Sequence, residues 1–297
     1  MNWQETRDFL LPCFPEAIRS ELMLLQPGEL REIRIRADRP TVFVTGTRTA
    51  SLDWQPGQHQ LEALVEALSG HSLYARSEET GQGFITLRGG HRLGLCGRVV
   101  HRKGGAVLTD IGSVCLRIAA QWPGCASPLL PHLISGDRIS SLLLIGPPGS
   151  GKTTLLRDIA LQLGGSSRQI AIIDQRGELA ACIGGIPQLD VGDHADVLEG
   201  MGKAEAVSWL MRSMAPQLII TDELSGSEDV AALCDAQSCG CGVMASVHGA
   251  SLTDAASRPA LAALMARRIF ERYAVLSAEG GGVIAGLYDR SGSPVSL

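Results

Sequence analysis

Short, mostly apolar runs recur along the second half of the chain. Each has the length of a strand and lacks strict alternation of apolar and polar residues, which is typical of strands buried on both faces of a parallel sheet. These runs occupy residues 141–145, 169–173, 217–221 and 243–247. Segments with helical periodicity lie between them, at 152–163, 203–214 and 227–238. The alternation predicts a largely parallel sheet covered by helices.

The first half has a different pattern, which predicts a smaller α+β domain. A helical stretch at 15–26 precedes two runs in which apolar and polar residues alternate, as they do in half-buried strands. An amphipathic helix follows at 61–68, and a further helix is expected from His71. The predicted strands are EIRIRAD (32–38), PTVFVTG (40–46), GFITLRGG (83–90), HRLGLCGRVVH (91–101) and VLTDIGSVCLRIA (107–119).

Between the two patterns lies QWPGCASPLLP (121–131), whose three prolines predict a linker. We therefore place the domain boundary between residues 120 and 136, with an N-terminal domain at 1–125 and a parallel-sheet domain at 126–297. Beyond residue 268, the segments IFERYAVLS and GGVIAGLYD predict a terminal hairpin.

Composition limits the function classes. The 297 residues are 45% hydrophobic and 19% charged, enough to bury a core. No apolar run approaches the roughly 18–20 residues that span a bilayer, and the start, MNWQETRDFLLPCF, lacks the features of a signal peptide. We therefore expect a cytoplasmic protein. The eight cysteines lack the paired spacing of a zinc ribbon, so we expect reduced thiols.

Charge is unevenly distributed. The net charge is −5; residues 1–135 carry 14 basic and 13 acidic side chains, whereas the remainder carries 12 and 18. An acidic balance argues against a dedicated duplex-DNA-binding protein. Only three of the 26 basic residues are lysines, so each lysine is a candidate for a specific role: Lys103, Lys152 and Lys203.

The strongest functional signal is a P-loop. GPPGSGKT (146–153) matches G-x-x-x-x-G-K-[ST] and lies between an apolar strand and a helix-forming run, as the motif requires. Its backbone N–H groups would cradle phosphates, Lys152 would reach the β- and γ-phosphates, and the Thr153 hydroxyl would bind Mg²⁺. We expect Mg-ATP to be bound by Gly146, Pro147, Pro148, Gly149, Ser150, Gly151, Lys152, Thr153 and Thr154.

Acidic residues follow the neighbouring strands. QLIIT leads into Asp222-Glu223, a Walker B pattern in which Asp222 would hold Mg²⁺ and Glu223 would orient the attacking water. An acidic pair can also merely open a helix, but here it follows a buried strand. Because the carboxyl ends of parallel strands meet at one edge, we predict one catalytic group: Lys152, Asp174, Glu178, Glu223 and His248. The acidic stretch 189–200 is expected to be a solvated loop.

The N-terminal half is rich in arginine. Arg34 and Arg36 alternate with Ile33 and Ile35, which places both guanidinium groups on one strand face. Two interpretations stay open: a solvated sheet face, or arginines that contact nucleotide phosphates. The candidates are Arg34, Arg36, Arg88, Arg92 and Arg98.

Several motifs together resemble the stage III sporulation protein AA family: GPPGSGKTTLLRDIA, KAEAVSWLMRSMAP, IITDE, ASVHG and EIRIRADRP. This family is related to the ATPases of type II and type IV secretion and of pilus motors. The resemblance implies a RecA-like P-loop NTPase domain in a hexameric ring ATPase. It also implies a place in the mother-cell cytoplasm, at a membrane channel leading to the forespore, and phosphate contacts made by N-terminal arginines.

Three positions depart from the family pattern. Gln175 stands where a glutamate is expected, and His194 and Gly226 stand where arginines are expected. Two cationic groups and one carboxylate are thus missing from loops near the nucleotide, whereas the P-loop is intact. The departures leave open a weakly hydrolysing, ATP-dependent structural subunit.

Two further classes of P-loop protein are alternatives to a secretion-type ATPase. A single-strand nucleic-acid-associated ATPase would need stacking platforms, and aromatic residues make up only 4% of the chain. A small-molecule kinase would need an arginine-bearing lid and an acceptor pocket, for which the sequence gives no signal. We therefore expect hydrolysis of ATP to ADP and phosphate that drives movement or assembly.

Overall fold

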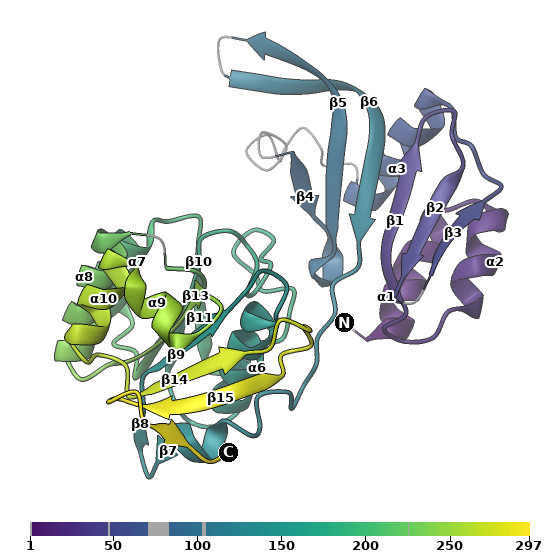
Figure 1. The fold of residues 1–297 in the computed structure, drawn as a ribbon. Helices are drawn as coiled ribbons and strands as arrows, with labels where there is room; N and C mark the ends of the chain where they lie inside the picture. The colour runs from purple at the N-terminus through teal and green to yellow at the C-terminus, as the bar shows by residue number, and fades with distance from the viewer. Residues whose placement is uncertain (1, 47, 71–82, 103–104, 225) are drawn as a thin grey trace. The chain divides into compact units, whose positions relative to one another are not determined.

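The computed structural model describes residues 2–46, 48–70, 83–102, 105–224 and 226–297, and the chain forms two compact units (Figure 1). Unit 1 ends at Ala120 and unit 2 begins at Gln121. The helix expected from His71 lies outside the described residues.

Unit 1 is built around a six-stranded sheet, and every strand pair among its described residues is antiparallel. The strand order is β3-β2-β1-β6-β5-β4. Its elements are α1 (Trp3–Leu10), η1 (Leu11–Cys13), α2 (Glu16–Leu24), β1 (Leu30–Arg36), β2 (Thr41–Thr45), β3 (Thr49–Leu52), α3 (Gln58–Ser69), β4 (Phe84–Thr86), η3 (Arg88–Gly90), β5 (Arg92–Arg102) and β6 (Gly105–Arg117).

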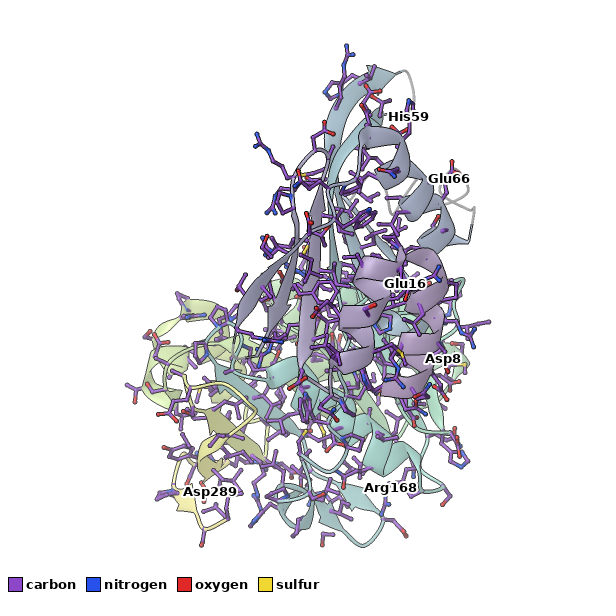
Figure 2. All side chains as sticks on the ribbon, turned by 90° about the vertical axis from the view of Figure 1, so that its right-hand side faces the viewer. Asp8, Glu16, His59, Glu66, Arg168 and Asp289 are labelled. Atoms are coloured by element: carbon purple, nitrogen blue, oxygen red, sulfur yellow. The ribbon has the colours of Figure 1, made fainter. Side chains whose placement is uncertain are left out.

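The helices of unit 1 cover one face of this sheet. Ile33 and Ile35 on β1 are fully buried and pack in one cluster with Ile18 of α2 and Leu61 of α3. Because side chains alternate along a strand, Arg34 and Arg36 lie on the other face, as the sequence predicts. Figure 2 shows the outer surface of the helices, where exposed polar side chains point away from the sheet: Asp8, Glu16, His59 and Glu66.

His91 is a buried titratable group between η3 and β5. Its side chain is 1% exposed, its Nδ1 accepts a hydrogen bond from the Ala119 N–H (3.0 Å), and its ring stacks on Phe9. An acceptor at Nδ1 places the proton of the neutral ring on Nε2. Burial lowers the pKa of His91 to about 4.

This buried imidazole predicts a loss of stability in acid. In the unfolded chain the histidine has a pKa of about 6.5, so this state binds the proton first as the pH falls. The contribution of the buried neutral imidazole to stability is therefore fully present above pH 6.5 and is lost as the pH falls towards 4. Between pH 7.5 and 5 we expect the free energy of unfolding to fall by about 2 kcal/mol more in the parent than in His91→Asn. The asparagine keeps an acceptor near the Ala119 N–H but does not titrate. Urea unfolding at both pH values checks this, and equal losses in the two proteins would contradict it.

Unit 2 contains an eight-stranded sheet in the order β11-β10-β12-β13-β9-β14-β15-β16. The strands from β11 to β14 are parallel, and β15 and β16 add an antiparallel edge. Its elements are α5 (Leu130–Leu133), β7 (Ile134–Ser135), β8 (Arg138–Ile139), β9 (Leu142–Gly146), α6 (Lys152–Gly164), β10 (Ile170–Asp174), β11 (Ala195–Glu199), α7 (Lys203–Ser213), β12 (Leu218–Thr221), α8 (Ser227–Ser238), β13 (Gly242–His248), α9 (Leu252–Ser257), α10 (Pro259–Ala266), β14 (Arg272–Leu276), β15 (Ile284–Asp289) and β16 (Pro294–Val295).

Helices cover both faces of the parallel strands, and this explains the apolar runs in the sequence. On β9, Leu143 and Ile145 belong to a core shared with α7, α8 and α10, whereas Leu142 and Leu144 pack with α6. Alternate residues of β10, β12 and β13 divide in the same way. A strand buried on both sides has no polar face, so it shows no alternation. The predicted architecture, a parallel sheet between helices, is confirmed.

Two segments differ from the sequence-based expectations, and a third forms as predicted but with an additional strand pairing. Residues 195–199 of the acidic stretch form the edge strand β11, because parallel pairing with β10 satisfies the backbone whatever the side-chain charge. The segment expected to be a linker is held against α6, where Asp158 accepts hydrogen bonds from the N–H groups of Gly124 and Ala126. The terminal hairpin β14–β15 forms, and β14 also pairs with β9 inside the main sheet.

Among the described residues, no helix combines the length and the apolar character needed to cross a bilayer. The eight cysteines are free thiols.

Candidate nucleotide-binding site

The P-loop forms a tight turn between β9 and α6 that depends on its glycines. A Cβ atom on Gly146 would meet the side chain of Ser150 and would lie 3.1 Å from Leu276 Cβ, so the first position leaves little space for a side chain. Gly149 and Gly151 have φ angles of 76° and 100°, in the left-handed region that side chains rarely adopt. These conformations let the chain make the tight turn before α6 at which the backbone N–H groups of P-loops bind phosphate.

The connection between β14 and β15 packs directly on the P-loop. The Gly282 N–H donates a hydrogen bond to Ser150 O (2.9 Å). A Cβ atom on Gly151 would lie 2.6 Å from Gly282 N, so glycine is needed there for this close approach as well as for its φ angle. The C-terminal hairpin thus forms part of the framework of the phosphate-binding loop.

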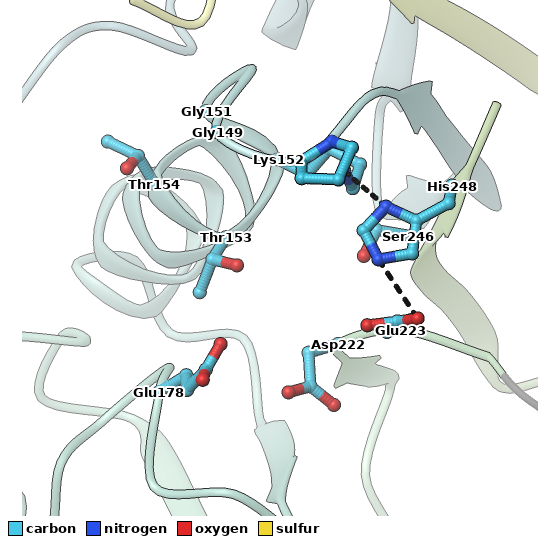
Figure 3. Close-up of a pocket in the computed structure, with 11 residues that line it drawn as sticks. Gly149, Gly151, Lys152, Thr153, Thr154, Glu178, Asp222, Glu223, Ser246 and His248 are labelled. Carbon is cyan, nitrogen blue, oxygen red and sulfur yellow. Dashed lines mark hydrogen bonds and ion pairs between the residues drawn. The ribbon is translucent and has the colours of Figure 1, made fainter. Parts of the chain in front are cut away.

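A cavity of about 360 Å³ lies at the carboxyl ends of the strands, in front of the P-loop (Figure 3). This volume lies within the range typical of small-molecule sites. It brings together most of the residues predicted from the sequence. Its lining consists of Pro148, Gly149, Gly151, Lys152, Thr153, Thr154, Glu178, Asp222, Glu223, Ser246 and His248. Gly146, Pro147 and Ser150 complete the turn without lining this cavity.

Lys152, His248 and Glu223 form a chain of interactions across the cavity. Lys152 Nζ donates to the carbonyl oxygens of Gly146 and Pro147 (2.8 Å each) and lies 3.3 Å from His248 Nδ1. Because an ammonium group can only donate, Nδ1 must accept, and the proton on Nε2 faces Glu223 Oε1 at 3.0 Å. The imidazole of His248 therefore lies between the Lys152 ammonium and the Glu223 carboxylate. Burial lowers the pKa of Lys152, and the Glu223 charge opposes this effect.

Asp222 is buried beside a second lysine. Its side chain is 4% exposed, and Oδ1 lies 3.4 Å from Nζ of Lys203, which begins α7. Oδ1 nevertheless has no hydrogen-bond partner of adequate geometry. Burial raises the pKa of the Asp222 carboxyl, and the Lys203 ammonium opposes this effect. Lys203 Nζ also donates to Gln175 Oε1 at 3.2 Å.

The oxygen ligands fit a hard cation such as Mg²⁺. Asp222 supplies a buried carboxylate oxygen that lacks a hydrogen bond, and the same cavity is lined by Thr153, whose hydroxyl is a further oxygen ligand. Mg²⁺ binds through one or two such protein groups and keeps water and phosphate oxygens as its other ligands. The described residues contain no cluster of three or more His, Cys, Asp or Glu side chains that could hold a metal alone.

Asp174 organises a loop beside the cavity, and the catalytic role predicted for it stays a prediction. It is fully buried and does not line the cavity. Its two carboxylate oxygens accept hydrogen bonds from four backbone N–H groups, those of residues 178–181, at 2.7–3.3 Å. A carboxylate with this many backbone donors organises a loop. The loop that it organises carries Glu178 into the cavity.

Arg157 holds the same loop from the P-loop helix. This side chain on α6 is 9% exposed, and its Nε donates to Leu179 O at 2.6 Å, while its Nη2 donates to Glu178 O. Asp174 thus binds the N–H groups of the loop and Arg157 binds its carbonyl groups. The position of Glu178 is therefore fixed to the helix that carries Lys152 and Thr153.

The three departures from the family pattern lie in different surroundings. Gln175 accepts its hydrogen bond from Lys203, and the neighbouring Arg176 lies 3.4 Å from Glu223 Oε2. Gly226 is the N-cap of α8, and His194 directly precedes β11; neither residue lines the cavity.

The candidate arginines of unit 1 lie on β1, η3 and β5. Arg34 forms an ion pair with Glu32 (2.7 Å), which also lies 3.2 Å from Arg117. Arg92 lies over the Phe84 ring, and Arg98 lies 3.9 Å from Asp110. Arg36 and Arg88 are exposed. Their relation to nucleotide phosphates stays a proposal.

Four residues of the site could not be assigned a role from the sequence. The only signal for Lys203 is the scarcity of lysines, and Ser246 lies two residues before His248, on the same face of β13. Arg157 and Gly282 gave no usable signal, because each acts on the backbone of a segment distant in sequence.

Comparison with known proteins gives a consistent result. The family model described as "Sporulation stage III, protein AA" matches residues 12–295. The chain is 40% identical over 292 residues to Stage III sporulation protein AA of Bacillus subtilis, with 95% of each chain covered.

Solved structures share the fold. The ATPase DotB of Legionella pneumophila is 15% identical and superposes with a TM-score of 0.60, covering 88% of this chain and 77% of that one. The pilus retraction motor PilT, solved with bound ADP, is 18% identical with a TM-score of 0.56, covering 83% and 74%. The fold is thus that of the RecA-like secretion and pilus ATPases, as the sequence predicts.

Proposed function

Because the chain belongs to the sporulation stage III, protein AA family, we propose that it binds Mg-ATP and hydrolyses it to ADP and phosphate in a sporulation complex. One observation carries this proposal: a single cavity joins the P-loop residues to Asp222, Glu223 and His248. The sequence letters of a P-loop occur in many contexts, but this arrangement provides the phosphate cradle, the metal ligands and a base together. The fold shared with DotB and PilT supports it.

The chain's own residues account for binding. Lys152 Nζ, now bonded to two P-loop carbonyl oxygens, needs only to turn towards the β- and γ-phosphates. The Thr153 hydroxyl and Asp222 Oδ1, the carboxylate oxygen that lacks a hydrogen bond, would hold the metal ion. When bound, Mg²⁺ supplies positive charge to the phosphate oxygens.

Glu223 is the group that acts on water. Oε1 accepts from His248 and Oε2 interacts with Arg176, so the carboxylate is held from both sides. Each oxygen keeps a further lone-pair site with which it can accept a hydrogen bond from a water molecule and orient it. His248 is a positioning residue in this scheme, because it aims the carboxylate while also touching Lys152.

We propose further that the protein acts as a ring, expected to be a hexamer, in the mother-cell cytoplasm. There it would dock on membrane channel proteins of the sporulation complex. The transition state spreads negative charge over phosphate oxygens that Lys152 alone does not cover. Arginines of unit 1, presented by the same or a neighbouring copy, would supply the missing charge. The candidates remain Arg34, Arg36, Arg88, Arg92 and Arg98.

Assembly should therefore raise activity. We expect the particle mass to increase with Mg-ATP, and phosphate release per chain to rise with protein concentration until the ring is complete. Light scattering and steady-state phosphate release over the same concentration series check this. A particle that stays monomeric, with activity per chain independent of concentration, would contradict the ring. ATP-dependent assembly without phosphate release would instead favour the structural-subunit alternative.

A further inference from the structure

Trp122 is an exposed indole on a rigid turn in unit 2. Its side chain is 59% exposed. On one side, Gln121 exchanges two hydrogen bonds with the backbone of Asp190 (3.0 and 3.2 Å). On the other side, the Cys125 N–H closes a turn onto Trp122 O, at 3.2 Å. A large aromatic side chain held in place yet left in water is a common feature of binding surfaces.

A buried carboxylate on α6 fixes the rest of this turn. Asp158 is 4% exposed, and its two oxygens accept hydrogen bonds from the N–H groups of Gly124 (2.9 Å) and Ala126 (2.7 Å). These charge-assisted bonds tie the turn to the P-loop helix. The backbone that carries the indole is thus held by hydrogen bonds on both sides of Trp122.

The turn lies beside the nucleotide cavity. A small cavity of about 10 Å³ separates Trp122 from one stripe of α6, which is formed by Thr154, Arg157, Asp158 and Leu161. Thr154 also lines the nucleotide cavity. Thr154 therefore lines both the small cavity beside the indole and the cavity in front of the P-loop.

The direction in which a nucleoside triphosphate binds determines which part of it lies near Thr154. Hydrolysis requires that the γ-phosphate face Glu223. Figure 3 shows Thr154 on the opposite side of α6 from Asp222, Glu223 and His248. A bound nucleoside triphosphate must therefore extend from Glu223 past Lys152 towards Thr154. Its nucleoside leaves the phosphate cradle on the side where Trp122 lies.

We propose that Trp122 is the stacking platform for the nucleobase of the bound nucleoside triphosphate. The inference rests on the proposed function and adds the group that recognises the base. The exposed indole face offers flat aromatic contact, and base–aromatic stacking contributes about 1–3 kcal/mol. Recognition by stacking depends on the presence of a base rather than on hydrogen bonds to its edge.

The experiment compares Mg-ATP with magnesium tripolyphosphate, which carries the same phosphate chain without a nucleoside. In the full-length protein, Trp122→Ala should raise the Kd for Mg-ATP by about 10- to 100-fold and leave the Kd for tripolyphosphate unchanged. Trp122→Phe should stay within about threefold of the parent, because phenylalanine also stacks. Trp209→Ala is the matched control: it removes another indole of unit 2, 52% exposed on α7, and should change neither Kd.

Calorimetric titration of both ligands separates the outcomes. If Trp122→Ala weakens both ligands equally, or weakens neither, the stacking role is wrong although the proposed function stands. If Trp122→Phe behaves like Trp122→Ala, recognition through an aromatic face is also wrong. If the parent binds neither ligand, the proposed function fails, and this inference fails with it.

Discussion

Lys152→Ala is expected to raise the Kd for Mg-ATP by at least about 10²-fold. Lys152 is the one lysine or arginine among the described residues that line the cavity. It would make charge-assisted bonds to two phosphates, each contributing about 1.5–3 kcal/mol. Phosphate release should fall to background, since the same charge is needed in the transition state. Equilibrium binding of a fluorescent ATP analogue and a phosphate-release assay measure the two effects.

Arg168→Ala is a suitable control for this change. It also removes one positive charge from unit 2, and Arg168, which donates to Gly136 O, does not line the nucleotide cavity. The control should bind and hydrolyse ATP like the parent. If Lys152→Ala binds ATP with the affinity of the parent, the nucleotide lies elsewhere and the proposed site is wrong.

Glu223→Gln should separate binding from chemistry. The introduced amide would keep an oxygen that accepts from His248 Nε2–H, so the cavity should retain its shape and Mg-ATP its affinity. The amide cannot take a proton from water, and turnover is therefore expected to fall by about 10²- to 10⁴-fold. Single-turnover phosphate release with bound ATP isolates this step from product release.

Glu228→Gln provides the matched control, because it makes the same chemical change at an exposed position in the first turn of α8. Its turnover should match that of the parent. Unchanged turnover in Glu223→Gln would remove this carboxylate from the mechanism. Loss of ATP binding in Glu223→Gln would mean that the residue serves affinity rather than the attack of water.

The strands and the phosphate loop could be predicted because their signals are local. The apolar runs around Leu143, Ile172 and Ile219 report burial on both faces of the sheet, and a sheet of this kind gathers its carboxyl ends at one edge. The spacing of Gly146, Lys152 and Thr153 encodes a single turn of backbone. Neither the strands nor the phosphate loop has to be predicted from contacts between distant segments.

The rest depends on contacts between distant segments, which single-sequence patterns do not encode. Asp174 ends its strand as a catalytic residue would, but its carboxylate turns back to bind amides of its own loop. Lys203 reaches Asp222 only because α7 begins beside the end of β12. Residues 195–199 look like a solvated loop because they are acidic, yet an edge strand takes its stability from backbone pairing.

The contact between Gly282 and the P-loop has a consequence for the order in which the protein is made. The ribosome completes the P-loop about 130 residues before it reaches Gly282. Both neighbours of β9 in the sheet, β13 and β14, also lie late in the chain. A nascent chain that stops short of β14 therefore carries the phosphate-binding sequence without the strands and the hairpin that shape it. The framework of the P-loop is therefore completed only near the end of synthesis, and we expect unfinished chains to bind nucleotide poorly.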